Sequence, residues 1–186
     1  DGVLNNVVMR GNIKSSPRKF SELNLPKDAY QIRELLSNLN IEIAVATNQP
    51  DISRGLLNKK NHQLILKRIS SFYNIPLENF FVCPHDNFEN CKCRKPKPGL
   101  ILNALKKFNI NPWEAVMIGD SLKDINASLK ASLKEEIFIS KDAKSQLISQ
   151  MKLKKEVPIF DKTSKALNYI EEKYFSKSFF NSSKKI

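Results

Sequence analysis

The sequence predicts an α/β fold with a mainly parallel sheet that is covered by helices on both faces. Short, nearly continuous apolar runs alternate along the chain with segments whose apolar residues recur at helical spacing. Small polar or glycine-containing clusters follow these runs, as is typical where buried parallel strands end. At 186 residues the chain suits one domain with a substantial core.

The predicted elements can be placed in chain order. A short apolar run covers residues 3–8, and the polar, turn-rich residues 11–26 indicate an irregular loop. The predicted helices cover residues 27–39, 58–73, 98–108, 121–131 and about 163–175. The predicted strands cover residues 41–46, 79–82, 115–118 and 136–139, with a weaker fifth at 157–160. We expect one domain over residues 1–175 and a basic, fraying tail over residues 176–186.

The formal net charge of +12 invites a nucleic-acid interpretation. However, lysines far outnumber arginines and are spread along the chain, whereas nucleic-acid surfaces usually cluster their cations among aromatic residues. We therefore expect mostly solvated lysines, with an anionic substrate or a polyanion partner as the alternatives. No apolar run approaches the roughly 18–20 residues of a membrane span, and no secretory signal is visible. A cytoplasmic monomer without membrane association is the expectation.

All three cysteines lie in one short stretch, as a Cys-x-His pair and a Cys-x-Cys pair. Cys83, His85, Cys91 and Cys93 supply four ligands of the kind that hold a structural zinc ion in tetrahedral geometry. The alternative is a set of ordinary reduced thiols. An odd number of cysteines argues against a disulfide framework, and Cys-x-Cys is not the spacing of thioredoxin-like redox sites. The sequence therefore predicts a zinc-stabilised loop.

Polar residues also gather where predicted strands end. The set comprises Asp1, Thr47, Asn48, Arg94, Lys95, Asp120 and Asp124. Ligands of open α/β sheets bind at the carboxyl ends of the strands, so we expect these side chains to lie together. Hydroxyl, amide, cationic and carboxylate groups suit a phosphate with a divalent metal, and hard oxygen ligands favour Mg²⁺. Each residue alone also fits a simpler role: Asp120 as a helix cap, Thr47 as a local hydrogen-bonding group, and Lys95 as a solvated charge.

Four segments together resemble the haloacid dehalogenase superfamily. They are Asp-Gly-Val-Leu-Asn at residues 1–5, Val-Ala-Thr-Asn-Gln at 45–49, the cysteine loop with Arg-Lys-Pro-Lys-Pro-Gly at 83–99, and Met-Ile-Gly-Asp-Ser-Leu-Lys-Asp at 117–124. Within the superfamily they resemble the zinc-loop branch of heptose bisphosphate phosphatases and histidinol-phosphate phosphatases. The resemblance runs from residue 1 to about residue 175. It implies a compact Rossmann-like domain without a large cap.

The resemblance implies roles for the charged residues. Asp1 resembles the general acid/base, whose backbone carbonyl also binds Mg²⁺, and Asp120 resembles the second Mg²⁺ ligand. Arg94 and Lys95 resemble the cationic clamp on the phosphoryl group. These roles suit phosphoryl transfer, which depends on positioning and charge neutralisation.

The resemblance also implies roles for neutral residues of the site. Thr47 and Asn48 resemble the motif that holds the transferring phosphoryl group. Asn5, Gln49 and Arg54 are weaker candidates for substrate contact.

Two departures from the superfamily pattern bear on these roles. The nucleophilic aspartate should lie two residues before Asp1 on an apolar central strand, so we expect the chain to be incomplete at its N-terminus. Residues 1–186 alone should not form an aspartyl-phosphate, and a missing central strand would leave two strand edges unpaired. Ser121 stands where close relatives often place a basic residue, which puts substrate contact at that position in question.

The leading hypothesis is a Mg²⁺-dependent phosphatase that acts on a small phosphorylated sugar. It would remove the 7-phosphate of D-glycero-D-manno-heptose 1,7-bisphosphate, a step the family associates with lipopolysaccharide or other surface glycans. Histidinol-phosphate phosphatase is the nearest alternative, although no histidine-pathway partner domain is visible, and a polynucleotide 3′-phosphatase is a more distant one. Hypotheses from other classes are a catalytically dead, zinc-stabilised phosphate-binding domain and a purely structural module.

Overall fold

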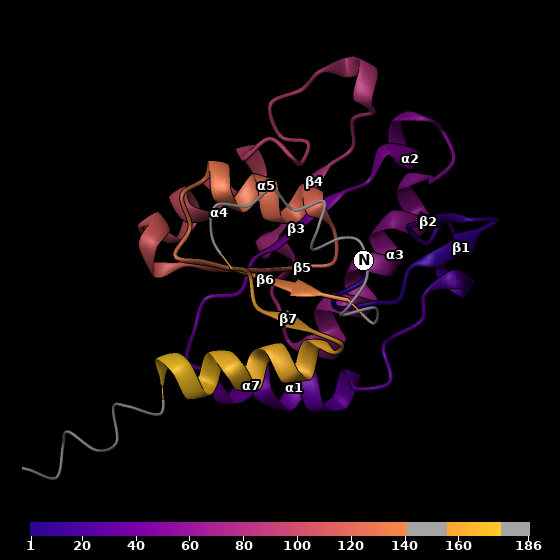
Figure 1. Ribbon diagram of the computed structural model, residues 1–186. Coiled ribbons are helices and arrows are strands. Elements are labelled where there is room, and N and C mark those ends of the chain that lie inside the picture. Colours follow the sequence, from indigo (N-terminus) through magenta and orange to yellow (C-terminus); the bar gives the residue numbers. More distant parts are fainter. Residues whose placement is uncertain (141–155, 176–186) are drawn as a thin grey trace, which may run out of the picture.

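The computed structural model describes residues 1–140 and 156–175, which form three layers (Figure 1). Strands make up the middle layer. Helices α4 (Gly99–Phe108) and α5 (Leu122–Lys130) lie on one side of it, and α1 (Ala29–Asn38) and α7 (Thr163–Tyr174) lie next to each other on the other side. Helices therefore cover both faces, as predicted. The tail predicted for residues 176–186 lies outside the described residues.

The middle layer consists of parallel strands. Strand β3 (Val45–Asn48) pairs with β4 (Phe80–Cys83), β5 (Val116–Gly119) pairs with β6 (Glu135–Ile139), and β6 pairs with β7 (Ile159–Phe160). The predicted mainly parallel sheet is confirmed. The first of these strands lies later than predicted, because the register sets Val45 opposite Phe80 and leaves residues 41–44 without an assigned strand.

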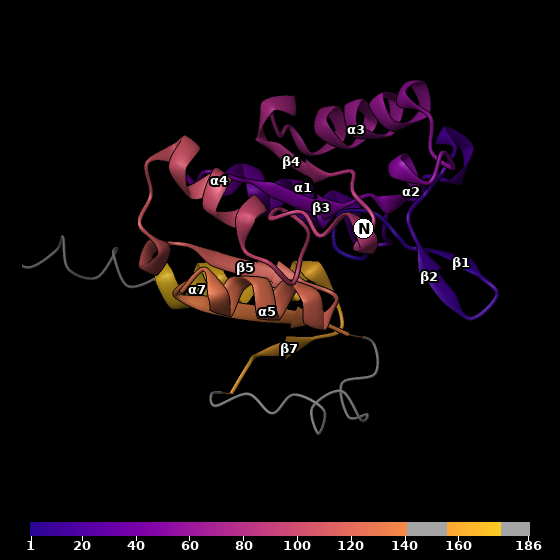
Figure 2. The same cartoon turned by 90° about the horizontal axis from the view of Figure 1, so that it is seen from above.

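The described strands do not form one continuous sheet. The pair β3–β4 and the set β5–β6–β7 are separate, with no backbone ladder between β3 and β5 (Figure 2). A cavity of about 1270 Å³ lies between them and is lined by apolar side chains from both, including Val45 of β3 and Val116 and Ile118 of β5. The parallel strands thus leave an apolar space at the centre of the layer.

Hydrophobic packing on the two sides of the strands holds the layers together. On the side of α1 and α7, Ile32, Ile137 and Ile170 belong to one buried cluster that extends onto α3 (Lys59–Tyr73). On the side of α4 and α5, a second buried cluster includes Ile101 and Ala127. The side chain of Asn58 begins α3 by accepting a hydrogen bond from the N–H of Asn61, a standard N-cap.

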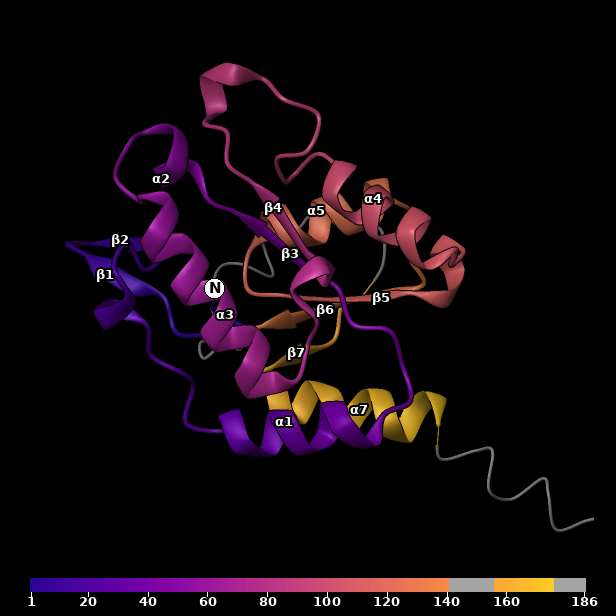
Figure 3. The ribbon, with the colours of Figure 1, turned by 180° about the vertical axis from the view of Figure 1, so that it is seen from behind.

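The N-terminal quarter of the chain differs from the prediction. Part of the expected loop over residues 11–26 belongs to an antiparallel hairpin of β1 (Val8–Arg10) and β2 (Ile13–Ser15), which projects from the body of the protein (Figure 3). Its turn uses Gly11 at φ +60°, a conformation that glycine adopts without strain. Further short elements that were not predicted are α2 (Pro50–Ser53) and the 3₁₀ turns Phe20–Glu22, Leu77–Asn79, Asn87–Glu89 and Pro112–Glu114.

Candidate active site

The predicted phosphate-site and magnesium-site residues converge on one end of the central cavity. Its lining includes Asp1, Asn5, Thr47, Asn48, Gln49, Arg54, Arg94, Lys95, Asp120 and Asp124. They come from the N-terminal segment, from the end of β3, from the loops after β3 and β4, and from the turn after β5. The carboxyl ends of the parallel strands thus build the site, as expected for an open α/β sheet.

Three neutral side chains hold the carboxylate of Asp1. Its Oδ1 accepts a hydrogen bond from Nδ2 of Asn5 at 2.8 Å. Its Oδ2 accepts from Oγ of Ser16 at 2.6 Å and from Nε2 of Gln49 at 3.0 Å. In the structure the amides of Asn5 and Gln49 orient Asp1, and the substrate contact predicted for both residues stays a prediction.

Thr47 and Gln49 lie next to each other and are both buried. Nε2 of Gln49 also donates to Oγ1 of Thr47 at 3.0 Å. The Oε1 atom of Gln49 is buried and has no hydrogen-bond partner among the described residues. A buried acceptor of this kind is costly unless a donor reaches it, so it is suited to a hydroxyl group of a ligand.

Asn48 and Lys95 are joined through the peptide backbone. Nδ2 of Asn48 donates to the Lys95 carbonyl at 3.0 Å, and the Lys95 N–H donates to Oδ1 of Asn48 at 3.1 Å. The side chain of Asn48 therefore fixes the backbone of Lys95 through two hydrogen bonds. A cis peptide bond links Lys95 to Pro96.

The ammonium group of Lys95 is buried in the site and paired with Asp124. Its Nζ lies 2.6 Å from Oδ1 of Asp124 and donates to the Ala46 carbonyl at 2.5 Å. Burial alone would raise the pKa of the Asp124 carboxyl, but the nearby charge of Lys95 and hydrogen bonds from Lys95 and Ser121 outweigh it and lower that pKa. A solvated Lys95, the simpler alternative, is excluded because the residue is 8% exposed.

In the turn after β5, the residue that caps α5 is Ser121 and not its neighbour Asp120. Ser121 is the N-cap of α5: its Oγ donates to Oδ2 of Asp124 at 2.6 Å, and its N–H donates to the same oxygen at 3.0 Å. The capping role considered for Asp120 therefore belongs to Ser121. Gly119 is required here, since a Cβ atom at this position would lie 2.3 Å from Cβ of Asp124.

Of the three site carboxylates, Asp1, Asp120 and Asp124, Asp120 has the fewest hydrogen-bond partners. Among residues 1–140 and 156–175 it receives no side-chain hydrogen bond, and its Oδ2 would lie 2.0 Å from a Cβ atom added at Gly2, next to Asp1. Burial raises the pKa of its carboxyl group and the charge of Asp124 adds to the rise, which together outweigh the lowering by nearby positive charges such as Lys95. A divalent cation bound here would remove this penalty, and a carboxylate oxygen is the kind of donor that Mg²⁺ prefers.

The four residues of the cysteine loop form a cluster suited to a tetrahedral metal. Their ligand atoms lie within 4.8 Å of one another. Nδ1 of His85 lies 3.6 Å from Sγ of Cys83 and 3.3 Å from Sγ of Cys93, and Sγ of Cys91 lies 3.6 Å and 3.4 Å from the same two sulfurs. Zinc bond lengths predict ligand separations of about 3.5–3.8 Å. All three thiols are free of disulfides, so the donor set fits a metal of this type.

Arg94 lies at the mouth of the cavity and is held by the cysteine loop. Its Nε donates to Oδ1 of Asn87 at 2.7 Å, and its Nη1 donates to the His85 carbonyl at 3.1 Å. The cysteine loop therefore sets the direction of this guanidinium. Of the two predicted clamp residues, Lys95 is buried in the site and Arg94 lies half-exposed at its rim.

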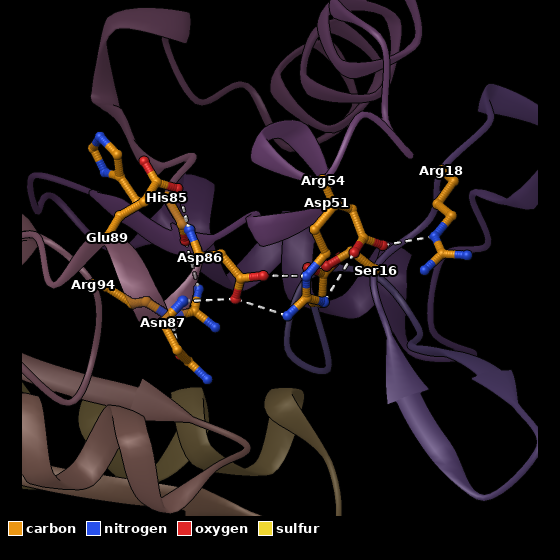
Figure 4. A network of polar contacts seen from close by, with 10 residues as sticks. Ser16, Arg18, Asp51, Arg54, His85, Asp86, Asn87, Glu89 and Arg94 are labelled. Carbon is orange, nitrogen blue, oxygen red and sulfur yellow. Dashed lines mark hydrogen bonds and ion pairs between the residues drawn. The ribbon is translucent and has the colours of Figure 1, made fainter.

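Arg54 is engaged with carboxylates from two segments (Figure 4). Its Nε and Nη2 donate to the two oxygens of Asp86 at 2.5 Å and 2.8 Å, and its Nη1 donates to Oδ1 of Asp51 at 3.2 Å. Arg18 pairs with the other oxygen of Asp51 at 2.7 Å. Arg54 lines the cavity, but these contacts bind it to the protein and leave its predicted substrate contact untested.

Several residues of this region were not predicted from the sequence. Ser16, Arg18, Asp51 and Asp86 come from loops and short elements with no motif of their own. A polar residue before a buried proline, as in Ser16-Pro17, gives no sequence signal for a contact with residue 1. The motif residues were predictable, but the side chains that hold them in place were not.

The chain matches the family model of the haloacid dehalogenase-like hydrolases over residues 11–138. This match covers more than half of the chain, so the protein belongs to that family. The predicted resemblance to the superfamily is confirmed. The prediction that the chain is an enzyme of this family, a hydrolase of phosphoric monoesters, is confirmed with it.

Two relatives and one solved structure show where in the family the similarity lies. The D-glycero-beta-D-manno-heptose-1,7-bisphosphate 7-phosphatase of Helicobacter pylori is 28% identical over 146 residues, which cover 76% of this chain and 80% of the relative. The D-glycero-alpha-D-manno-heptose-1,7-bisphosphate 7-phosphatase of Campylobacter jejuni is 31% identical over 139 residues, which cover 72% of this chain and 74% of the relative. A crystal structure of D,D-heptose 1,7-bisphosphate phosphatase from B. bronchiseptica, with magnesium and phosphate, matches with a TM-score of 0.75 at 20% identity over 92% of this chain and 94% of that one.

The structural match supports the fold, and the relatives confirm the predicted resemblance to the heptose bisphosphate phosphatases. In the described part of the chain, none of the helices combines the length and apolar character that a bilayer span requires.

Proposed function

We propose that this protein is a Mg²⁺-dependent phosphatase that removes the 7-phosphate of D-glycero-D-manno-heptose 1,7-bisphosphate through an aspartyl-phosphate intermediate. The observation that carries the proposal is the convergence of Asp1, Thr47, Lys95 and Asp120 at one end of the cavity. The names of the Helicobacter and Campylobacter relatives support the heptose substrate. These two names differ in the anomer, so both anomers enter the test below.

The residues of the site would divide the chemistry of the reaction between them. As the P–O bond to the sugar breaks, Asp1 protonates the leaving alkoxide. It then takes a proton from the water that attacks phosphorus and releases phosphate. Lys95, Arg94 and the Thr47 hydroxyl hold the phosphoryl oxygens, and Asn48 keeps Lys95 in place. Mg²⁺, held by Asp120 and the Asp1 carbonyl, would neutralise charge on the phosphoryl group.

The nucleophile of this reaction is proposed to lie on a strand immediately upstream of Asp1. The separation of β3 from β5 and the apolar cavity between them support this, because a parallel strand that ends at Asp1 would pair with both edges. The Ala46 carbonyl of β3 accepts a hydrogen bond from Nζ of Lys95. An aspartate two residues before Asp1 would then enter the same end of the cavity.

Zinc is proposed as the metal of the cysteine loop, held by Cys83, His85, Cys91 and Cys93. The near-tetrahedral separations of these atoms support it. The ion would stiffen the loop that carries Arg94 and Lys95. We further propose that the protein acts in the cytoplasm as a monomer on its small soluble substrate.

Phosphate release by the protein expressed from its complete coding sequence tests the proposal. The substrates are the α and β anomers of the heptose bisphosphate and, in parallel, histidinol phosphate. Asp120→Asn is expected to abolish Mg²⁺-dependent turnover while the zinc content stays at the wild-type level. A preference for histidinol phosphate would replace the proposed substrate, and full activity of the Asp120→Asn variant would refute the assigned metal site.

A further inference from the structure

We propose that Ser16 is a positioning residue that fixes the carboxylate of Asp1, and that a ladder of alternating charges ties Ser16 to the zinc loop. The ladder consists of Arg18, Asp51, Arg54 and Asp86, and the zinc loop is the segment over residues 83–95. The inference rests on the proposed role of Asp1 as general acid/base. It adds a structural path between the metal loop and the reacting proton.

Ser16 makes the shortest of the three hydrogen bonds to the Asp1 carboxylate. Its Oγ lies 2.6 Å from Oδ2 of Asp1, compared with 2.8 Å for the Asn5 amide and 3.0 Å for the Gln49 amide. Pro17, which follows Ser16, is fully buried and anchors this part of the loop. A hydroxyl held in this way limits the rotation of the carboxylate, which a general acid must keep aimed at its leaving group.

The loop that carries Ser16 is fixed in turn by Asp51. Nε of Arg18 lies 2.7 Å from Oδ2 of Asp51, and the Arg18 N–H donates to Oε2 of Glu22 at 2.7 Å. Asp51 is 5% exposed, so its pairing with Arg18 takes place in a largely dehydrated environment. The segment 16–18 is therefore held at both ends, by Asp1 through Ser16 and by Asp51 through Arg18.

Arg54 continues the connection from Asp51 to the zinc loop (Figure 4). It contacts Oδ1 of Asp51 at 3.2 Å and binds both oxygens of Asp86. Asp86 directly follows the metal ligand His85, and its Oδ1 also accepts from the N–H of Asn87 at 2.6 Å. A two-point arginine–carboxylate contact fixes orientation as well as distance. The zinc loop is therefore held in a fixed position relative to α2.

The ladder is better suited to fixing geometry than to adding stability. Two arginines alternate with two aspartates, so its net charge is zero, and buried or half-buried pairs often contribute little net free energy because of their dehydration cost. Their benefit is a defined arrangement of three chain segments around the mouth of the cavity. The consequence expected for the enzyme is a change in the rate of the chemical step, with substrate binding preserved.

Steady-state kinetics with heptose bisphosphate, on the protein expressed from its complete coding sequence, tests the role of Ser16. Ser16→Ala is expected to lower kcat about tenfold and leave KM unchanged, because a small misorientation of a reacting group slows chemistry without removing a substrate contact. Ser16→Thr keeps the hydroxyl and should retain most of the wild-type kcat. Ser21→Ala, at an exposed serine of the following turn, is the control. An unchanged kcat in Ser16→Ala, a change confined to KM, or a threonine variant as slow as the alanine variant would overturn the proposal.

A double-mutant cycle tests the ladder. Asp51→Asn should lower kcat in the wild-type background but have little further effect in Ser16→Ala, because both changes free the same carboxylate. Effects that multiply would show that the ladder does not act through Ser16. Zinc content and circular dichroism report whether each variant folds. If Asp51→Asn does not fold, Arg18→Gln replaces it in the cycle. Lys165→Gln, which breaks an exposed ion pair with Asp161, is the control.

The same series separates this inference from the proposed function. Asp1→Asn is expected to be inactive. If Asp1→Asn keeps full turnover, the assigned acid/base is wrong and the proposed mechanism fails with it. If Asp1→Asn is inactive while Ser16→Ala is unimpaired, the mechanism stands and the inference about Ser16 is wrong.

Discussion

Replacing Asp124 by alanine is expected to destabilise the protein severely, because the change leaves a buried ammonium group without its partner. The side chains of Lys95 and Asp124 are 10% and 6% exposed, and their charged atoms lie 2.6 Å apart. Breaking one partner of such a pair typically costs about 3–5 kcal/mol. The same substitution removes the acceptor of Ser121 at the start of α5, which adds about 1 kcal/mol. The expected loss is therefore about 4–6 kcal/mol in the free energy of unfolding.

Urea denaturation of the protein expressed from its complete coding sequence measures this loss. At a slope of about 2 kcal/mol per molar urea, the midpoint should fall by about 2–3 M. Asp124→Asn keeps an acceptor for Ser121 and should lose less than Asp124→Ala. Asp161→Ala is the matched control, since its exposed pair with Lys165 contributes at most about 1 kcal/mol.

The double variant Lys95→Met/Asp124→Leu distinguishes an unpaired charge from a loss of packing. Removing both charges should recover much of the stability, because the dehydration cost of Lys95 disappears with its charge. A midpoint for Asp124→Ala within about 0.5 M of wild type would refute the reasoning. So would a double variant no more stable than Asp124→Ala.

Two further predictions address other parts of the molecule. Cys91→Ser should reduce bound zinc and speed hydrogen exchange across residues 83–95, since metal binding is part of the folding free energy of such a loop. The control is Lys92→Gln at the exposed neighbouring position, which should change neither the zinc content nor the exchange rate. Burial opposes the ionisation of Glu135, but hydrogen bonds from Lys173, Tyr174 and Tyr169 outweigh it and lower the pKa of Glu135 below its ordinary 4.5. Its contribution to stability is fully present above pH 4.5 and is lost as the pH falls through the lowered pKa. Glu135→Gln should therefore reduce the unfolding free energy at neutral pH, and this reduction should shrink as the pH falls below 4.5.

The longer elements of the fold could be predicted because their patterns are local. The helix predicted at residues 58–73 is observed as α3, and the strand predicted at 115–118 is observed as β5. The start of β3 could not be predicted, because its register against β4 and not its own apolar run decides where pairing begins. The hairpin of β1 and β2 was missed because its strands are three residues long, too short for a periodic signal.

The candidate site shows a similar division. The sequence motifs predicted that Asp1, Lys95 and Asp120 would meet, and the structure brings them together. The motifs did not predict that Asn5 and Gln49 would hydrogen-bond to Asp1, because such contacts depend on how distant loops pack. Sequence patterns can identify reacting groups by their chemistry, whereas the groups that orient them have ordinary chemistry and are identified by their location.

The balance of charge in the buried site gives an independent reason for a divalent cation. Asp1, Asp120 and Asp124 contribute three carboxylates. Lys95 is a buried cation that faces them, and the more exposed Lys14 and Arg94 line the same cavity. Lys95 is already paired with Asp124, so the remaining carboxylates would repel the phosphate that the site is proposed to bind. Burial raises the pKa of Asp120, so ionising this carboxylate carries part of the penalty. A bound Mg²⁺ would convert that repulsion into attraction. Metal binding is therefore expected to precede substrate binding, and phosphate affinity measured without Mg²⁺ should be much weaker than affinity measured with it.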